Sequence, residues 1–331
     1  MVDYYFCKKE SDSFMHNIRA MILVFLLIVI VNFAHLASSC DCGLERVRPR
    51  IFNGERMAFQ KYPWMAYIRF YSSDDFKSFT PCGGVLIDEY HIMTAAHCLH
   101  YIEGGNMVKR DPKLTMIFVD AFKTNDRNLP EAFRAEGYLI PPGYKYTRHG
   151  NDIGLIRLTR PVKGVMPICI PDSDEKPYYG SDFNIAGWGL DGVSTNVRAI
   201  PRETVVNHIP YQECYELKKK YYVSKNFVSR ASADRVPPLA EGEICAANKQ
   251  TRADACYGDS GNPLMWKDPM NNRWYLIGIT AGALDDCGST KGNLIPGIYT
   301  ALHRHKRPLL RKVLRKCVVP FALKEIVSFK K

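Results

Sequence analysis

The chain lacks several features that would each assign it to a well-defined class. It has 11 cysteines but no Cys-x-x-Cys pair, so neither a zinc ribbon nor a thioredoxin-type site is supported. It has no Asn-x-Ser/Thr sequence, so no N-linked sugar is expected. No segment repeats at a fixed period, and no apolar run is long enough to cross a membrane as a helix.

The composition is that of a globular protein. The 331 residues are about twice the ~150 of a typical domain, so one large or two smaller domains are expected. Apolar residues make up 46% and charged residues 24%, which excludes a disordered chain. Lys and Arg total 45 against 34 Asp and Glu, and the net charge of +11 favours acidic partners without identifying one.

The longest apolar run, 21–31, has the length of the core of a secretory signal. A membrane-spanning helix needs about 20 apolar residues, and this run is too short. Small residues follow at 37–39, so residues 1–39 are predicted to be a signal peptide with a long polar start, translated from any of three methionines. A buried core helix and a retained signal-anchor, which would give a membrane-anchored protein, are the alternatives.

Removal of residues 1–39 takes away Cys7 and leaves ten cysteines. An even number suits disulfide bonding in an oxidising compartment. The mature chain is therefore expected to be secreted. Residues 40–50 are short, charged and contain proline, so they cannot form a domain.

From Ile51 to the end of the chain, short apolar runs alternate with turn residues. Runs such as 64–68, 153–158 and 275–280 are separated by Gly, Pro, Asn and Asp. That pattern predicts many short antiparallel strands in a sandwich or barrel. Two segments are predicted to be helical: Pro210 to Tyr222, and the segment from His303 onward. The second has a stripe of apolar residues at helical spacing.

Three separated residues can together perform nucleophilic catalysis. A serine hydroxyl such as that of Ser260 needs a base to take its proton, and histidine suits that task because its pKa lies near neutrality. A carboxylate such as Asp152 can fix the tautomer of His97. Gly258 allows its own N–H and that of Ser260 to converge on one developing oxyanion.

The motifs around these residues resemble those of the chymotrypsin-like (trypsin-fold) serine endopeptidases. The resemblance covers roughly Ile51 to Cys317 and implies an all-β fold of two packed antiparallel β-barrels with a C-terminal α-helix. Its motifs occur in the family's order: Cys82-Gly83-Gly84, Thr94-Ala95-Ala96-His97-Cys98, Asn151-Asp152-Ile153, Gly187-Trp188-Gly189, Gly258-Asp259-Ser260-Gly261 and Pro296-Gly297-Ile298-Tyr299.

The resemblance implies a role for each site residue. His97 is the expected general base and acid, Asp152 its orienting carboxylate, and Ser260 the nucleophile that forms an acyl-enzyme. Asp254 matches the carboxylate at the base of the S1 pocket, which binds the side chain on the amino side of the cleaved bond. The matching wall positions are Gly282 and Gly297. A carboxylate at the end of an open slot predicts cleavage after Arg or Lys.

The resemblance also implies activation by proteolysis, with residues 40–50 as a short propeptide. Cleavage between Arg50 and Ile51 is expected to free an α-amino group that pairs with Asp259 and orders the oxyanion loop. The implied disulfides are Cys42–Cys169, Cys82–Cys98, Cys214–Cys245 and Cys256–Cys287. Cys40 and Cys317 remain, and we suggest that they pair, although sequence cannot fix connectivity.

Three residues depart from the family's pattern. Ala281 replaces a tryptophan that forms the floor of the S2–S4 region, so weaker selection of residues upstream of the cleaved bond is expected. Asn262 replaces the second glycine of Gly-Asp-Ser-Gly-Gly-Pro and adds a side chain behind the nucleophile, leaving both oxyanion donors in place. Thr280 replaces a serine that hydrogen-bonds the triad carboxylate, and its hydroxyl is expected to make the same bond to Asp152.

The leading hypothesis is a secreted zymogen of trypsin-like specificity that uses no metal or cofactor. The alternative is a non-catalytic homologue that acts as a binding module. Expected partners are substrates with Arg or Lys at the cleaved bond and protease inhibitors, and no nucleic acid is expected. After Thr300 the chain has ten Lys or Arg residues against one acid, Glu325. This basic C-terminal extension is either a site for a heparin-like polyanion or an ordinary solvated helix face.

Overall fold

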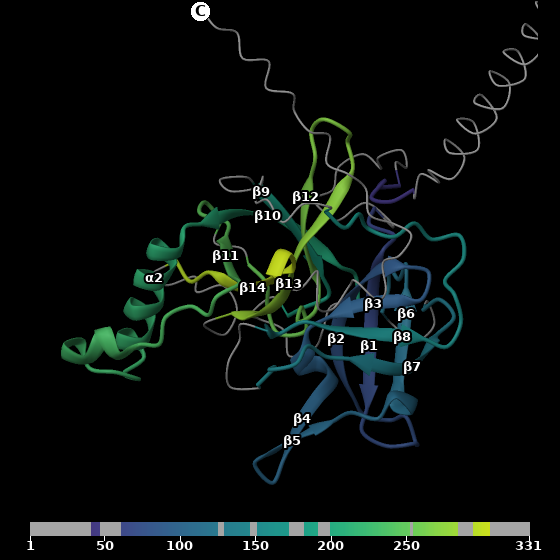
Figure 1. The fold of residues 1–331 in the computed structure, drawn as a ribbon, viewed down its shortest axis with the longest axis horizontal. Coiled ribbons are helices and arrows are strands. Elements are labelled where there is room, and N and C mark those ends of the chain that lie inside the picture. Colours follow the sequence, from purple (N-terminus) through teal and green to yellow (C-terminus); the bar gives the residue numbers. More distant parts are fainter. Residues whose placement is uncertain are drawn as a thin grey trace, which may run out of the picture. The chain divides into compact units, whose positions relative to one another are not determined.

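The computed structural model describes residues 41–46, 61–124, 129–145, 151–171, 182–190, 199–251, 254–283 and 294–304 (Figure 1). Contacts divide the chain into two units, Met1–Cys40 and Asp41–Lys331, and every described residue belongs to the second. The predicted signal peptide, the junction between Arg50 and Ile51, and the expected C-terminal helix beyond Arg304 lie outside the described residues. Among those described, no helix has the length and apolar character to cross a membrane.

The first barrel closes six antiparallel strands in the order β1-β2-β3-β8-β7-β6. All seven residues of β1 are buried, which is why this apolar run contains almost no polar residue. β1 pairs with β2 on one side and with β6 on the other, and this second pairing closes the barrel. Its strands are β1 (Met65–Tyr71), β2 (Phe79–Asp88), β3 (His91–Thr94), β6 (Thr115–Val119), β7 (Phe133–Leu139) and β8 (Gly154–Leu158).

The second barrel also has six antiparallel strands, in the order β10-β11-β14-β13-β12-β9. β9 pairs with both β10 and β12 and so closes it. The prediction of two antiparallel β-barrels is confirmed. The strands are β9 (Asp182–Gly187), β10 (Arg202–Ile209), β11 (Glu243–Ala247), β12 (Pro263–Lys267), β13 (Trp274–Ala283) and β14 (Gly297–Ala301).

One apolar cluster extends from the first barrel into the second, which also has buried clusters of its own. A single cluster of buried side chains includes residues of β1, β2 and β3 together with Met265, Leu276 and Ile279 of the second barrel. The Trp64 indole N–H donates to the Met265 sulfur at 3.3 Å. Burial of large aromatic side chains contributes strongly to such an interface, so the barrels are held together by the same apolar packing that stabilises each one.

Helical structure is sparse in the part of the chain that the structure describes. The predicted helix at 210–222 is confirmed as α2 (Tyr211–Ser224), which buries Cys214, Lys218 and Tyr221 at spacings of four and three residues. Figure 1 shows α2 beside β11, to which the Cys214–Cys245 bridge ties it. The short 3₁₀ helices are η1 (Ala96–Leu99), η2 (Pro112–Leu114), η5 (Arg230–Arg235) and η6 (Leu302–Arg304), and a two-stranded hairpin pairs β4 (His100–Glu103) with β5 (Asn106–Lys109).

Three of the four implied disulfides are present: Cys42–Cys169, Cys82–Cys98 and Cys214–Cys245. Cys256 is disulfide-bonded as well, and its predicted partner, Cys287, lies outside the described residues. Cys40 and Cys317, which the sequence left without a fixed partner, also lie outside them.

Candidate active site

The first barrel brings His97 and Asp152 together at one end of a strand pair. η1, which carries His97, begins two positions after the end of β3, and Asp152 lies two positions before the start of β8. Because β3 and β8 are antiparallel, with Thr94 opposite Gly154, the end of one strand lies beside the start of the other. Asp152 is 2% exposed and binds His97 twice: its Oδ1 accepts the His97 backbone N–H at 2.8 Å, and its Oδ2 lies 2.6 Å from Nδ1.

The electrostatics of this pair favour a charged imidazole. Burial alone lowers the His97 pKa, but the charge of Asp152 and its hydrogen bond outweigh that effect and raise the pKa above its usual value. The carboxylate beside Nδ1 assigns the proton of the neutral ring to Nδ1, which leaves Nε2 as an acceptor. His97 is therefore arranged to take up a proton at Nε2.

Ser260 belongs to the loop before β12 and contacts the first barrel. Its carbonyl oxygen accepts the Gly83 N–H at 2.8 Å. The Sγ of Cys98 lies 3.7 Å from this same oxygen and 3.7 Å from His97 Nε2, so the serine and the histidine approach the same sulfur. In the described part of the chain, no hydrogen bond joins the Ser260 hydroxyl to the His97 ring.

The loop around Ser260 has a backbone conformation that requires glycine. Gly258 has φ +94° and Gly261 has φ +88°, a region that side chains other than glycine rarely adopt. The N–H groups of Asp259 and Gly261 are bonded to the carbonyls of Cys256 and Thr280. The N–H groups of Gly258 and Ser260 have no acceptor among the described residues, so two donors remain for an incoming oxygen.

Asp254 lies in the same loop, six residues before Ser260. Its Oδ1 accepts the Ala255 N–H at 2.7 Å and the Tyr299 hydroxyl at 3.0 Å. Burial raises the pKa of this carboxyl to about 8, although the bonds from Ala255 and Tyr299 oppose the rise. Sequence reasoning missed Tyr299, and the signal available was its i, i+2 spacing from Gly297, which puts both on one face of β14.

Gly282 and Gly297, the predicted walls of the S1 pocket, differ in the space available beside each of them. A Cβ atom on Gly297 would lie 2.4 Å from Asp254 Oδ1, so a side chain there would collide with the carboxylate itself. A Cβ atom on Gly282 would meet nothing within 4 Å, so Gly282 borders open space.

Asp259, the predicted partner of a new N-terminus, points between the two glycines that flank Trp188. Its Oδ1 accepts the Gly189 N–H at 2.8 Å and its Oδ2 accepts the Cys256 N–H at 3.0 Å. A Cβ atom on Gly187 or Gly189 would lie 2.0 Å or 2.2 Å from an Asp259 oxygen. Glycine at both positions therefore gives the carboxylate its room. Arg50 and Ile51 lie outside the described residues.

The prediction for Thr280 is wrong. Its hydroxyl donates to the carbonyl oxygen of Asn262 at 3.0 Å, and no bond to Asp152 is present in the described structure. The Thr280 N–H donates to that same carbonyl at 2.9 Å, because β13 runs alongside the loop that follows Ser260. The hydroxyl thus contacts the loop that follows Ser260 instead of the Asp152 carboxylate.

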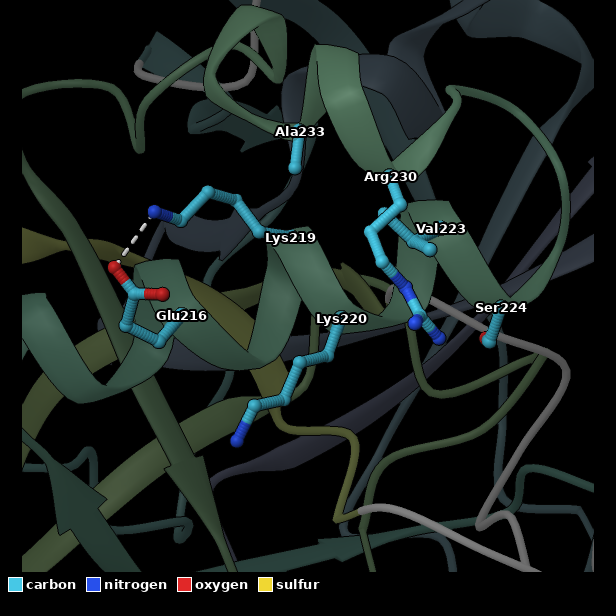
Figure 2. Close-up of a pocket in the computed structure, with 7 residues that line it drawn as sticks. All are labelled: Glu216, Lys219, Lys220, Val223, Ser224, Arg230 and Ala233. Carbon is cyan, nitrogen blue, oxygen red and sulfur yellow. Dashed lines mark ion pairs between the residues drawn. The ribbon is translucent and has the colours of Figure 1, made fainter.

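A hollow of about 390 Å³ lies between α2 and η5, away from the residues described so far (Figure 2). In it Lys219 reaches toward Glu216, and their charged groups are 2.7 Å apart. None of the predicted catalytic or specificity residues lines it. Its lining residues are Glu216, Lys219, Lys220, Val223, Ser224, Arg230 and Ala233.

One cluster within the described residues has the spacing of a metal site: Cys82, His97 and Cys98. Zinc and similar ions bind cysteine as the thiolate. Both sulfurs here belong to the Cys82–Cys98 disulfide, so the cluster does not fit a metal ion.

Comparison with known proteins places the chain in a family. The family model described as Trypsin matches residues 51–307. The chain belongs to the trypsin family of serine proteases. Within this family, the clotting factor G beta subunit of Tachypleus tridentatus is 30% identical, with 79% of each chain covered.

Two other trypsin-family relatives show how the similarity extends over longer proteins. Phenoloxidase-activating enzyme 1 of Spodoptera litura is 31% identical over 80% of this chain and 67% of that protein. The mannan-binding lectin serine protease 1 of Rattus norvegicus is 27% identical over 80% of this chain but only 36% of its own length.

Proposed function

We propose that this trypsin-family chain is an endopeptidase that hydrolyses peptide bonds after Arg or Lys, with Ser260 as nucleophile. The observation that carries the proposal is the buried Asp152 carboxylate, 2.6 Å from His97 Nδ1, at a site that Ser260 also approaches. In a pseudoprotease at least one of these groups is expected to be lost, and here all three remain.

In the proposed reaction His97 Nε2 accepts the proton of the Ser260 hydroxyl while Oγ attacks the substrate carbonyl carbon. The N–H groups of Gly258 and Ser260 then stabilise the oxyanion. His97 next donates its proton to the leaving amine, which departs and leaves an acyl-enzyme. Water attacks the acyl group with His97 again as base, and Asp152 stays ionised throughout.

The specificity follows from Asp254. A substrate Arg or Lys side chain would enter past Gly282 and pair with the Asp254 carboxylate, which is already held by Ala255 and Tyr299. Pairing with a cation also favours ionisation of a carboxyl whose pKa burial has raised. Peptide substrates and macromolecular inhibitors that present a basic residue are the expected partners.

The proposed enzyme is made as a secreted zymogen. Cleavage after Arg50 would free the Ile51 amine, and Asp259, between Gly187 and Gly189, is its expected partner. The relatives named for activation and clotting support a role in extracellular proteolysis, because those processes involve one protein acting on another.

Labelling with a fluorophosphonate, which forms a covalent bond with an activated serine, tests the proposal. After cleavage at Arg50, we expect about one label per chain on Ser260 and hydrolysis of an Arg p-nitroanilide but not of a Glu analogue. Ser260→Ala is the control and should take up no label. A correctly disulfide-bonded, cleaved chain that neither takes up label nor hydrolyses substrate would favour the non-catalytic binding module.

A further inference from the structure

Asn262 occupies a sealed position behind the nucleophile loop, between the two barrels. Its side chain is 1% exposed. A Cβ atom on Gly83 of β2 would lie 1.9 Å from Asn262 Oδ1, and one on Gly187 of β9 would lie 2.3 Å from Nδ2. The amide therefore fills the space that glycine leaves in each barrel.

The amide of Asn262 makes one hydrogen bond and leaves one buried atom without a partner. Its Nδ2 donates to Asp259 Oδ1 at 3.1 Å. Its Oδ1 has no hydrogen-bond partner in the described structure. An unpaired buried acceptor is costly, and a hydrogen bond to a charged carboxylate is among the stronger ones available to offset that cost. A side chain that merely filled space would not need a donor directed at the Asp259 carboxylate.

Asp259 is the carboxylate on which the proposed activation depends. In the described part of the chain, backbone N–H groups of Gly189 and Cys256 hold it from two sides, and Asn262 adds a side-chain donor. The Asn262 donor comes from within the nucleophile loop and does not require cleavage at Arg50. It also carries no charge that titrates, unlike an α-amine.

We propose that Asn262 is a positioning residue that holds Asp259 in place in the uncleaved chain, and so partly orders the Gly258–Ser260 loop before the Ile51 amine is released. The inference rests on the proposed function and adds to it a built-in basal activity. The uncleaved protein would then bind cationic ligands and turn over substrate at a measurable fraction of the cleaved enzyme's rate, because part of the ordering is already present.

The test compares Asn262 with Asn262→Gly in an uncleavable Arg50→Gln chain and in the cleaved protein. Two readouts are used: binding of p-aminobenzamidine, a fluorescent cation, and kcat/KM for an Arg p-nitroanilide. We expect the substitution to lower both readouts in the uncleaved chain at least tenfold more than in the cleaved protein. An equal loss in both forms would show a merely structural role and overturn the proposal.

Two further variants keep the test decisive. Asn262→Leu has nearly the same size but no donor, and should show the same selective loss, which covers a failure of the glycine variant to fold. Thr280→Val removes a hydrogen bond to the Asn262 carbonyl while keeping the amide bond to Asp259, so its effect should be equal in the two forms. A selective loss in Thr280→Val would assign the effect to loop packing and refute the inference.

Supplying the amine from outside gives a directional readout. The dipeptide Ile-Phe carries the amine and side chains of Ile51 and Phe52. If Asn262 orders Asp259 in advance, uncleaved Asn262→Gly should need more dipeptide for half-maximal probe binding. If it needs less, Asn262 competes with the amine and the inference is wrong. Probe binding does not require catalysis, so this result stands apart from any failure of the proposed hydrolysis.

Discussion

The proposed role of Asp254, binding a cationic side chain, depends on the ionisation of its carboxyl. Burial raises the pKa of its carboxyl to about 8, and the nearby charge of Asp259 adds to the rise, while Ala255 and Tyr299 oppose it. The group is therefore largely protonated, and uncharged, below that pH. A cationic side chain gains its full attraction only above it.

We predict that the inhibition constant of benzamidine falls as pH rises from 6 to 9. Each pH unit below a pKa reduces the ionised fraction about tenfold, so the constant at pH 6 should be about 100-fold that at pH 9. Inhibition of the cleaved protein measured across this range checks it. Asp254→Ser should bind weakly with a flat profile, and a flat profile in the unsubstituted protein would contradict the prediction.

At the residue scale, the sequence was informative where a motif names the chemistry. His97, Asp152 and Asp254 could be singled out by motif and order. The direction of the Thr280 hydroxyl could not, because a hydroxyl turns to whichever acceptor the folded chain offers. Nor could the bond from Asn262 to Asp259, which needs Gly83 and Gly187 to leave space from two separate barrels.

The N-terminal segment 41–46 is attached to the second barrel by more than its disulfide. The Glu45 carboxylate accepts from Lys267 at 2.8 Å and from the Trp274 indole N–H at 3.1 Å. The Gly43 N–H donates to the Pro167 carbonyl, and Arg46 pairs with Asp120. The segment therefore has its own polar contacts with the protein, which would remain if the chain were cleaved after Arg50.

These contacts predict a pH-dependent contribution to stability. Burial alone would raise the Glu45 pKa, but Lys267 and Trp274 outweigh it, so the pKa in the folded protein is lower than in the unfolded chain. The stabilisation is present above the unfolded value of about 4.3 and is lost as pH falls through the lower folded value.

We expect Glu45→Gln to lower the midpoint of thermal unfolding near pH 6.5 and to have a progressively smaller effect below pH 4. Melting curves from pH 3 to 7 measure the difference. In a Lys267→Met background most of the pH dependence should disappear. If Glu45→Gln lowered the midpoint of thermal unfolding by the same amount at every pH, Glu45 would contribute by packing alone.

At the element scale, the barrels could be predicted because buried strands are apolar runs bounded by turn residues. The segment of α2 was also predicted to be helical, although its buried face includes a lysine, Lys218. η5 could not, because Arg230–Arg235 buries no residue and has no apolar period. The β4–β5 hairpin could not be predicted for a related reason. Its apolar residues Tyr101, Ile102 and Met107 are exposed, so its strands show no alternation between buried apolar and exposed polar residues.

The whole molecule has a net charge of +11, and its basic residues offer two candidate surfaces for a polyanion. One is the extension after Thr300, whose predicted helix lies outside the described residues. The other is the hollow between α2 and η5, where Lys220 and Arg230 have no ion-pair partner among the described residues. Both surfaces would attract sulfated chains through their positive charge.

We predict that the C-terminal extension is the stronger heparin site, because its positive charges outnumber its acids by the wider margin. Arg311→Gln with Lys312→Gln should elute from heparin at lower salt than the unsubstituted protein. Lys220→Gln with Arg230→Gln removes the same charge from the hollow and should shift elution less. Equal shifts would indicate attraction by total charge, and a larger shift for the second pair would locate binding at α2.

The hydrogen bond from Gly83 N–H to the Ser260 carbonyl crosses from one barrel to the other. The proposed base and its carboxylate stand on one side of this seam, and the nucleophile and Asp254 stand on the other. A small slip along the seam would separate Ser260 from His97 without disturbing the Asp254 slot. Substitutions far from the site that loosen the seam should therefore slow turnover while cationic inhibitors bind with unchanged affinity.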